Sequence, residues 1–382
     1  MIIGVPKETF PGERRVALAP HVIASLKKDG HDVLLQAGAG AEAGFPDREF
    51  EEKGARIAAA RPDVFANADV IAQIRGLGAN RESGRADLEL LRDKQIVAAL
   101  LDPLTAPQSV RDLAEKKVTA FSLELVPRIT RAQSMDVLSS QASIAGYKAV
   151  ILAAGALPKI FPMIMTAAGT ITAARVFVIG AAVAGLQAIA TARRLGAIVQ
   201  AYDVRAAAKE AVASLGGKFL EIHMPEGGAE DKGGYAKAQS EEFLKRQREM
   251  MTSVISTSDV VITTALIPGK PAPVLVTADM VKTMAPGSVV VDIAAERGGN
   301  CELTKADKTV IENGVTILGP TDLPSTVPHH SSQMYAKNMS TFLLHILQDG
   351  ALRPDLDEEI VKETLVTKDG EIVHARVREA LG

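Results

Sequence analysis

Short apolar runs, mostly of β-branched residues, alternate along the chain with longer segments in which apolar residues recur at helical spacing. In the first third, five runs predict strands at residues 2–5, 33–36, 70–74, 96–100 and 118–123. Helices are predicted between them, at residues 21–28 and 109–117. Strands that alternate with helices in this way form a parallel sheet with helices on its faces. We therefore expect the first third to form an α/β domain.

A longer stretch with few helix-breaking residues, 132–154, predicts one long helix in which Gly146 is the exception. A second series of strands and helices follows, in the order typical of a nucleotide-binding half. Its predicted strands cover residues 175–179, 198–202, 260–264, 288–293 and 315–318, and its predicted helices cover residues 184–195, 209–215 and 278–284.

A charged, glycine-containing stretch interrupts the second series and predicts a mobile loop, about residues 223–240, followed by a polar helix up to residue 248. Another helix is predicted at residues 333–347, and Asp369-Gly370 predicts the tight turn of a β-hairpin. We expect two Rossmann-like α/β domains, with parallel sheets flanked by helices, joined by long helices and separated by a cleft. Their predicted bounds are residues 1–135 with 328–382, and residues 136–327.

Length and composition narrow the class of protein. A chain of 382 residues exceeds the usual size of one core, which favours two domains. The 43 basic and 46 acidic residues are interspersed, so we expect no nucleic-acid partner. The single cysteine, Cys301, excludes an intrachain disulfide and a multi-cysteine metal site, and it fits a reducing cytoplasm. The sequence shows no secretion signal, and the apolar stretch 173–192 predicts strand, turn and helix rather than a membrane span, so a soluble protein is expected.

The most specific local pattern is Val-Phe-Val-Ile-Gly-Ala-Ala-Val-Ala-Gly, residues 176–185. Gly180 permits a tight turn after the strand, Gly185 lets the next helix pack closely, and the helix start presents N–H groups to a pyrophosphate. Ala182 stands where the dinucleotide fingerprint has its second glycine, and its methyl group is either tolerated or weakens binding. This turn alone is weak support, because similar turns occur in sheets that bind nothing.

Asp203 lies at the end of the next predicted strand, 23 residues after Gly180. This is close to the spacing of an acid that accepts hydrogen bonds from the ribose of adenosine. A carboxylate there repels a 2′-phosphate and favours NAD(H) over NADP(H), whereas Arg205 argues in the opposite direction. We expect NAD(H), because a carboxylate at the strand end outweighs a flexible neighbour.

A polar cluster leads into the long predicted helix. Gln133 and Asp136 are predicted on one helical face, and Arg128 lies just upstream. Two interpretations stay open, a site for the amide of a nicotinamide and a capped helix start with a solvated face. The loops at residues 265–273 and 296–300 follow predicted strands and are expected to border a cofactor.

Other reactive residues give no catalytic pattern. His329 and His330 are adjacent and point in different directions, so we expect them in a loop before a helix and assign no metal. No serine lies in a Gly-x-Ser-x-Gly pattern, and the lone cysteine has no histidine near it in sequence. Met163 and Met165 are expected in the core.

Several stretches of the sequence resemble one family. Residues 3–8 with 12–20 are similar to the opening signature shared by alanine dehydrogenases and pyridine nucleotide transhydrogenases, and residues 180–203 resemble their second signature apart from Ala182. Three further stretches look specifically like the NAD(H)-binding component of transhydrogenases, called domain I or the α or α1 subunit: residues 128–141, 263–273 and 298–301. The resemblance covers nearly the whole chain.

The resemblance implies a homodimer of two-lobed subunits that binds NAD(H) between the lobes and docks on an NADP(H)-binding domain, or β subunit, above a proton-conducting membrane domain. By matching position, it places four residues at the nicotinamide end: Arg128, Gln133, Asp136 and Ser139. It places the rest of the dinucleotide against three segments: Gly180, Ala182, Val183, Ala184 and Gly185; Asp203, Val204 and Arg205; and Thr264, Ala265 and Leu266. Gly233, Gly234 and Tyr235 match a mobile loop that folds over the bound nucleotide.

The implied reaction passes hydride directly between two nicotinamide rings, so the protein supplies proximity, ring orientation and exclusion of water. Because the chain stops at Gly382 without membrane helices, it resembles systems in which this domain is a separate cytoplasmic polypeptide, held at the inner face of the plasma membrane by partner subunits. The alternative is an alanine dehydrogenase-like enzyme. Arg15 matches the carboxylate-binding arginine of that enzyme, but its lysine falls on Arg75 and its histidine near Leu100-Leu101-Asp102. A non-catalytic NAD-binding module is the third interpretation.

Overall fold

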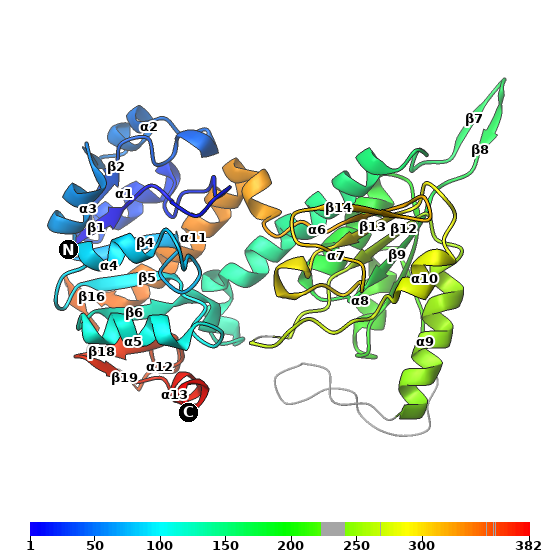
Figure 1. Ribbon diagram of the computed structural model, residues 1–382. Coiled ribbons are helices and arrows are strands. Elements are labelled where there is room, and N and C mark those ends of the chain that lie inside the picture. The colour runs from blue at the N-terminus through cyan, green and yellow to red at the C-terminus, as the bar shows by residue number, and fades with distance from the viewer. Residues whose placement is uncertain (223–240, 268, 349, 354, 356) are drawn as a thin grey trace. The chain divides into compact units, whose positions relative to one another are not determined.

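The computed structural model describes all residues of the chain except 223–240, 268, 349, 354 and 356. The chain divides into two units, each built around its own large sheet (Figure 1). Met1–Gln141 and Pro324–Gly382 form the first unit, and Ala142–Leu323 forms the second. Both sheets are mostly parallel and flanked by helices, which confirms the predicted fold class.

The sheet of the first unit includes every strand predicted in the first third of the chain. Its strands are β1 Ile2–Val5, β2 Asp32–Gln36, β3 Arg56–Ala58, β4 Val70–Arg75, β5 Ile96–Leu100, β6 Thr119–Ser122, β18 Leu365–Lys368 and β19 Glu371–Ile372. Their order is β19-β18-β6-β5-β4-β1-β2-β3, and only β18 and β19 run antiparallel to their neighbours. Asp369 and Gly370, between these two strands, have φ of 50° and 88°, which confirms the predicted tight turn.

Helices cover both faces of this sheet because its buried strand residues alternate between two apolar clusters. Ile3 and Val33 face one cluster together with helices α1 and α11, whereas Leu34 and Ile71 face the other together with α3 and α5. The helices of the unit are α1 Pro20–Lys28, α2 Asp47–Glu52, α3 Arg61–Asn67, α4 Arg85–Leu90, α5 Pro107–Glu115, α11 Pro328–Ile346, α12 Glu359–Thr364 and α13 Ala375–Leu381. A short ribbon is formed by β16 Leu347–Gln348 and β17 Ala351–Leu352.

Helix α11 begins five residues earlier than predicted, because Pro328 occupies its first turn, where proline is favoured. His329 and His330 therefore lie in the helix, and their predicted placement in a loop is wrong. The Nδ1 atom of His329 lies 2.9 Å from the carbonyl oxygen of Ala43, and its ring stacks on Phe45 with a centroid distance of 4.3 Å. This histidine is thus held by packing within its own unit.

The second unit has seven strands in the order β11-β10-β9-β12-β13-β15-β14, all parallel except β14. They are β9 Arg175–Ile179, β10 Ile198–Tyr202, β11 Lys218–Phe219, β12 Val260–Thr263, β13 Val289–Asp292, β14 Thr309–Glu312 and β15 Val315–Leu318. Its helices are α7 Val183–Arg194, α8 Ala208–Ser214, α9 Glu241–Ile255 and α10 Ala278–Lys282. Both faces of the sheet are again buried, since Val176 and Val178 enter one apolar cluster and Phe177 and Ile179 the other.

Helix α6, Val137–Ala156, is the one helix among the described residues that is long and apolar enough to cross a membrane by these two criteria alone. Its residues Ala145, Ala149 and Val150 belong to an apolar core cluster of the second unit. A Cβ at Gly146 would overlap the carbonyl oxygen of Ala184, so this glycine lets α6 and α7 approach closely. The glycine that interrupts the sequence pattern is thus a packing contact.

A small hairpin, β7 Ile164–Thr166 and β8 Gly169–Ile171, projects from the second unit (Figure 1). Met163 is 59% exposed and Met165 is 74% exposed, so their predicted placement in the core is wrong. The prediction failed because it took apolar character as a sign of burial, whereas this hairpin packs on no core cluster of its unit.

Candidate functional site

Two loops leave the second sheet at the point where its strand order changes direction. The chain runs from β9 through β10 to β11 on one side, and from β12 through β13 to β15 on the other, while β9 and β12 are hydrogen-bonded neighbours. In open α/β sheets, ligands bind at the carboxyl ends of two such strands. Residues 180–185, here called the glycine turn, follow β9, and Thr264 follows β12.

Both glycines of the turn are required by close contacts. Gly180 has φ of +97°, and a Cβ there would lie 2.5 Å from Oγ1 of Thr264. A Cβ at Gly185 would overlap the carbonyl oxygen of Gly180. The hydroxyl of Thr264 donates to that same oxygen at 3.1 Å and ties the turn to the end of β12. The chain therefore forms the narrow backbone cradle that a dinucleotide pyrophosphate fits.

Ala182 is the N-cap of α7, with φ of −83° and ψ of −167°, and no side chain of the described residues caps this helix. L-residues adopt this extended conformation readily, so the methyl group in place of the fingerprint's second glycine causes no backbone strain. Ala182 and Val183 are exposed and Ala184 is half-buried. The first N–H groups of a helix have no acceptor within it, and they give the start of α7 a partial positive charge.

Asp203 directly follows β10 and is hydrogen-bonded to the glycine turn. Its Oδ2 accepts the N–H of Ala181 at 2.7 Å, and its Oδ1 accepts the N–H and the Nε of Arg205, both at 2.9 Å. Burial by itself raises the pKa of this carboxyl group, but the hydrogen bonds from Arg205 and Ala181 outweigh it and hold the pKa below its ordinary value. Asp203 is therefore an ionised acceptor beside the turn. Val204, the next residue, is half-buried.

The loop after β12 is held by one buried amide that the sequence analysis did not single out. Asn300, with no exposed surface, accepts the N–H of Ala265 at 2.9 Å and donates to the carbonyl oxygens of Ala265 and Pro273 at 2.9 and 2.8 Å. Leu266, next in the loop, is 46% exposed. The glycines before Asn300 suggested only a turn, because asparagine is common in turns and its tertiary partners are 27 and 35 residues away.

The polar cluster before α6 lies in the first unit, and the structure joins two of its members. Asp136 accepts the N–H of Ser139 at 2.9 Å and its hydroxyl at 2.6 Å, so it caps α6. Gln133 belongs instead to a preceding 3₁₀ helix, Thr130–Met135. The prediction that Gln133 and Asp136 share one helical face is wrong, because capping places the aspartate outside the α-helix. Arg128 and Gln133 are exposed, whereas Asp136 and Ser139 are half-buried.

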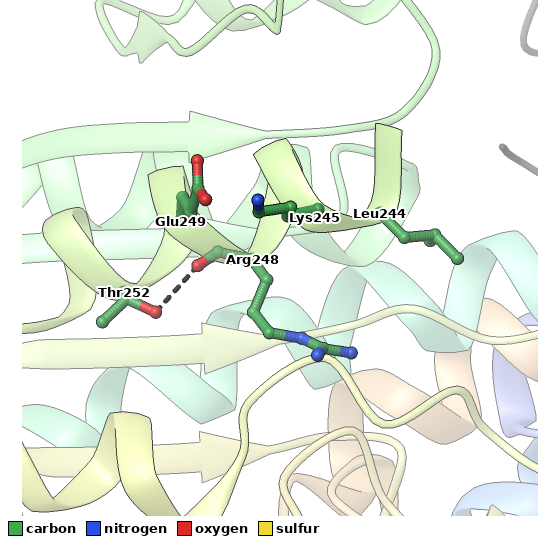
Figure 2. A pocket seen from close by; sticks show the side chains of 5 residues that line it. All are labelled: Leu244, Lys245, Arg248, Glu249 and Thr252. Atoms are coloured by element: carbon green, nitrogen blue, oxygen red, sulfur yellow. Dashed lines mark hydrogen bonds between the residues drawn. The ribbon is translucent and has the colours of Figure 1, made fainter. Parts of the chain in front are cut away.

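Gly233, Gly234 and Tyr235, the predicted mobile-loop residues, lie outside the described residues. The helix that follows them, α9, borders an open hollow (Figure 2) lined by Leu244, Lys245, Arg248, Glu249 and Thr252. In this hollow the hydroxyl of Thr252 donates to the carbonyl oxygen of Arg248 at 2.8 Å. None of the lining residues is a predicted site residue.

A buried ionic network lies at the carboxyl ends of β1 and β4, where the first sheet changes direction. Glu13 accepts the Nε and Nη2 of Arg15 at 2.7 and 2.5 Å, and the Nε of Arg75 lies 3.5 Å from its Oε2. The Nη1 of Arg15 donates to Gln141 at 2.9 Å. Burial raises the pKa of Glu13, but the Arg15 guanidinium outweighs burial and lowers this pKa to about 2.

Two family patterns together match most of the chain. The alanine dehydrogenase/PNT N-terminal domain matches residues 4–145 and the alanine dehydrogenase/PNT C-terminal domain matches residues 149–375, PNT being pyridine nucleotide transhydrogenase. The chain belongs to the alanine dehydrogenase/PNT family. This confirms the resemblance found in the signature stretches, and it implies a nicotinamide nucleotide as the bound cofactor.

Relatives within the alanine dehydrogenase/PNT family differ in their similarity to this chain. The first of the two-part alpha subunit chains of NAD(P) transhydrogenase from Rhodospirillum rubrum is 48% identical over 377 residues, 98% of each chain. The crystal structure of a transhydrogenase from Sinorhizobium meliloti is similar with a TM-score of 0.85 at 44% identity, covering 98% of this chain and 99% of that one. Alanine dehydrogenase of Bacillus subtilis is 28% identical over 392 residues, covering 100% of this chain and 95% of the relative. The chain is thus more similar to these transhydrogenases than to this alanine dehydrogenase.

Proposed function

We propose that the chain is the NAD(H)-binding component of a proton-translocating transhydrogenase, active only together with an NADP(H)-binding component. The observation that carries the proposal is the glycine turn with the Asp203 carboxylate bonded to it at Ala181, in a chain whose relatives are transhydrogenase subunits. When bound, the nicotinamide of NAD(H) gives or takes the hydride exchanged with NADP(H) on the partner component.

At the glycine turn, the residues of this chain bind and orient. Gly180 and Gly185 leave room for the pyrophosphate, and the N–H groups of Ala182, Val183 and Ala184 donate to its oxygens. The start of α7 adds its partial positive charge to this contact. The pyrophosphate is therefore held mainly by backbone atoms, whose positions the fold fixes.

The adenosine and the loop after β12 complete the dinucleotide site. Asp203 and Val204 meet the adenosine ribose, and the negative charge of Asp203 favours NAD(H) over NADP(H). Thr264, Ala265 and Leu266 border the nucleotide, and the buried bonds of Asn300 to Ala265 support this border.

At the nicotinamide end, Arg128 and Gln133 orient the ring, and Asp136 and Ser139 support them. All four residues lie in one short segment, and the Asp136–Ser139 contact fixes its connection to α6. Direct transfer between two rings requires no side chain to give or take a proton, so proximity and exclusion of water are the tasks left to the protein.

We further propose a homodimer that docks on the NADP(H)-binding β subunit and on membrane-spanning subunits, which carry the coupled proton translocation. The subunit names of the relatives support these partners. The β7–β8 hairpin supports the dimer, because the exposed apolar side chains of Met163, Met165 and Ile171 favour contact with a second copy. Through such partners the chain is placed peripherally on the inner face of the plasma membrane.

An alanine dehydrogenase-like activity is the competing function, and two observations weigh against it. The guanidinium of Arg15, the residue that matches the carboxylate-binding arginine, is bonded to Glu13 and Gln141. The residue at the position of the catalytic lysine is Arg75, whose guanidinium stays charged at neutral pH and does not act as a base. A non-catalytic NAD-binding module has no observation in its favour.

A mixing assay tests the proposal. The purified chain is combined with an NADP(H)-binding transhydrogenase component, NADPH and an NAD⁺ analogue whose reduced form absorbs at its own wavelength. We expect reduction of the analogue only when both components are present, and no oxidation of L-alanine by the chain with NAD⁺. Binding of NADH without transfer would support the non-catalytic module, and alanine oxidation would support the competing enzyme.

A further inference from the structure

The carboxylate of Asp203 has its acceptor positions filled by donors of this chain. Oδ1 accepts the N–H and the Nε of Arg205, and Oδ2 accepts the N–H of Ala181 and the Nη2 of Arg205 at 3.0 Å. A carboxylate offers about four lone-pair positions, so these four donors use them all. A ribose therefore finds no vacant position on this group.

The four donors divide into two fixed and two movable ones. The N–H groups of Ala181 and Arg205 belong to the backbone and stay in place while the fold persists. The other two donors sit on one guanidinium, one facing each carboxylate oxygen. The 2′- and 3′-hydroxyls of an adenosine ribose are likewise two donors on neighbouring atoms. They match in number and spacing the two positions that the Arg205 side chain occupies.

The two side chains differ in their contact with water. The side chain of Asp203 is 7% exposed, whereas that of Arg205 is 24% exposed and can return to solvent by rotation about its own bonds. We propose that the Arg205 guanidinium is an internal substitute for the ribose diol, which leaves Asp203 when NAD(H) binds and thereby sets both affinity and nucleotide choice. This inference rests on the proposed binding of NAD(H) at the glycine turn.

The displaced guanidinium has opposite effects on the two nucleotides. It competes with the diol of NAD(H) for Asp203, so it weakens NAD(H) binding. For NADP(H), whose 2′-hydroxyl carries a phosphate, the guanidinium offsets the repulsion from Asp203, since it is anchored two residues away and carries the opposite charge. Arg205 therefore narrows the discrimination that Asp203 provides.

Calorimetric titration of the full chain with NADH and with NADPH tests this inference. Arg205→Met keeps the stem and removes the guanidinium, so we expect about fivefold tighter binding of NADH, the size of one ion pair lost to competition, and weaker binding of NADPH. Asp203→Asn should act in the opposite direction, with about tenfold weaker NADH binding and tighter NADPH binding. Arg194→Met, at the carboxyl end of α7, is the matched control and should leave the NADH/NADPH ratio unchanged.

Arg205→Lys keeps the charge but cannot bridge both oxygens, and should give NADH affinity between those of wild type and Arg205→Met. It also serves if the methionine variant does not fold, as judged by its circular dichroism spectrum. The inference is overturned if removal of the guanidinium weakens NADH binding or leaves the nucleotide ratio unchanged. Failure of the proposed function is distinct, because the wild-type chain would then bind no NADH at all.

Discussion

At Gly185, helix α7 comes so near the carbonyl oxygen of Gly180 that any Cβ would overlap it. The overlapping atom belongs to the backbone, so it cannot move aside as the end of a flexible side chain does. The residue scale thus decides whether the glycine turn keeps its shape. Gly155, by contrast, lies in α6 with open space where a Cβ would stand.

Gly185→Ala should therefore shift α7 away from the turn and weaken NADH binding by at least about tenfold, as expected when a close geometric fit at a binding site is lost. Fluorescence titration with NADH measures the change. Gly155→Ala is the control, and it should leave the affinity unchanged and stabilise α6 by up to about 1 kcal/mol. Equal affinities of the two variants would contradict the assigned role of the turn.

Glu8 is a second residue whose environment determines its chemistry. It is 8% exposed and accepts the N–H groups of Ile74 and Arg75 at 2.7 and 3.2 Å. Burial, followed by the nearby charge of Glu13, raises the pKa of Glu8 to about 8. The folded chain therefore holds a proton there that the unfolded chain releases above its ordinary pKa of 4.5.

The pKa of Glu8 gives stability a definite pH dependence. Because the folded state binds this proton more tightly, the contribution is favourable below the unfolded pKa and is lost as pH rises toward about 8. Glu8→Gln removes the titration, so the free energy of unfolding of wild type minus that of the variant should fall between pH 5 and pH 8. Urea titrations at both pH values measure it. Parallel pH profiles of the two proteins would disprove the assignment.

At the scale of elements, the beginning of α6 shows how one residue ends one helix and starts another. Asp136 terminates the 3₁₀ helix Thr130–Met135 and, through both carboxylate oxygens, holds the N–H and hydroxyl of Ser139 in the first turn of α6. The capping interpretation of this segment is thus correct. Gln133 takes no part in the cap, so binding and capping are separable by mutation.

Asp136→Ala should lower the free energy of unfolding by about 1 kcal/mol, because the helix loses its cap. Gln133→Ala, at an exposed position, should change it by less than about 0.5 kcal/mol and yet weaken NADH binding. Thermal unfolding and NADH titration of both variants give the two quantities. If Gln133→Ala leaves NADH affinity intact, the cluster is a helix cap and nothing more.

At the scale of the whole molecule, the two units have the same design with different contents. Each sheet changes direction between two neighbouring parallel strands, β1 and β4 in the first and β9 and β12 in the second. In the first unit the ends of these strands are filled by the ionic network of Glu13, Arg15 and Arg75. In the second they carry a glycine turn, whose missing side chains leave space for a ligand.

Assembly is decided at this scale by the β7–β8 hairpin. Met165→Glu should weaken the proposed dimer, because a charge would have to be buried at the interface, while stability of the subunit stays within about 0.5 kcal/mol. Sedimentation velocity across a concentration series measures the shift toward monomer. Ile311→Glu is the control, since Ile311 is 69% exposed on β14 at an edge of the same sheet. An unchanged dimer in the Met165 variant would remove the hairpin from the interface.

Local patterns sufficed for most elements near the proposed sites. The buried strands β9, β10 and β12 are continuous apolar runs, and the small residues between β9 and α7 indicate the turn, because these signals depend only on neighbours in the chain. Short elements such as α2, α4 and β3 were missed, since three to six residues carry too little periodicity. The exposure of Met165 was also missed, because apolar character alone does not tell a core from a surface.

The sequence by itself determined the alternating α/β order, the glycine turn and the acid at the end of the next strand, because each is a short-range pattern of residue type and spacing. Tertiary structure alone decided the partners of the polar groups: Arg205 on Asp203, Asn300 on Ala265, and Glu13 between two arginines. Hydrogen bonds and desolvation depend on which atoms meet in space. Residues such as Asn300 and Ala265, 35 positions apart, meet only once the sheet has formed.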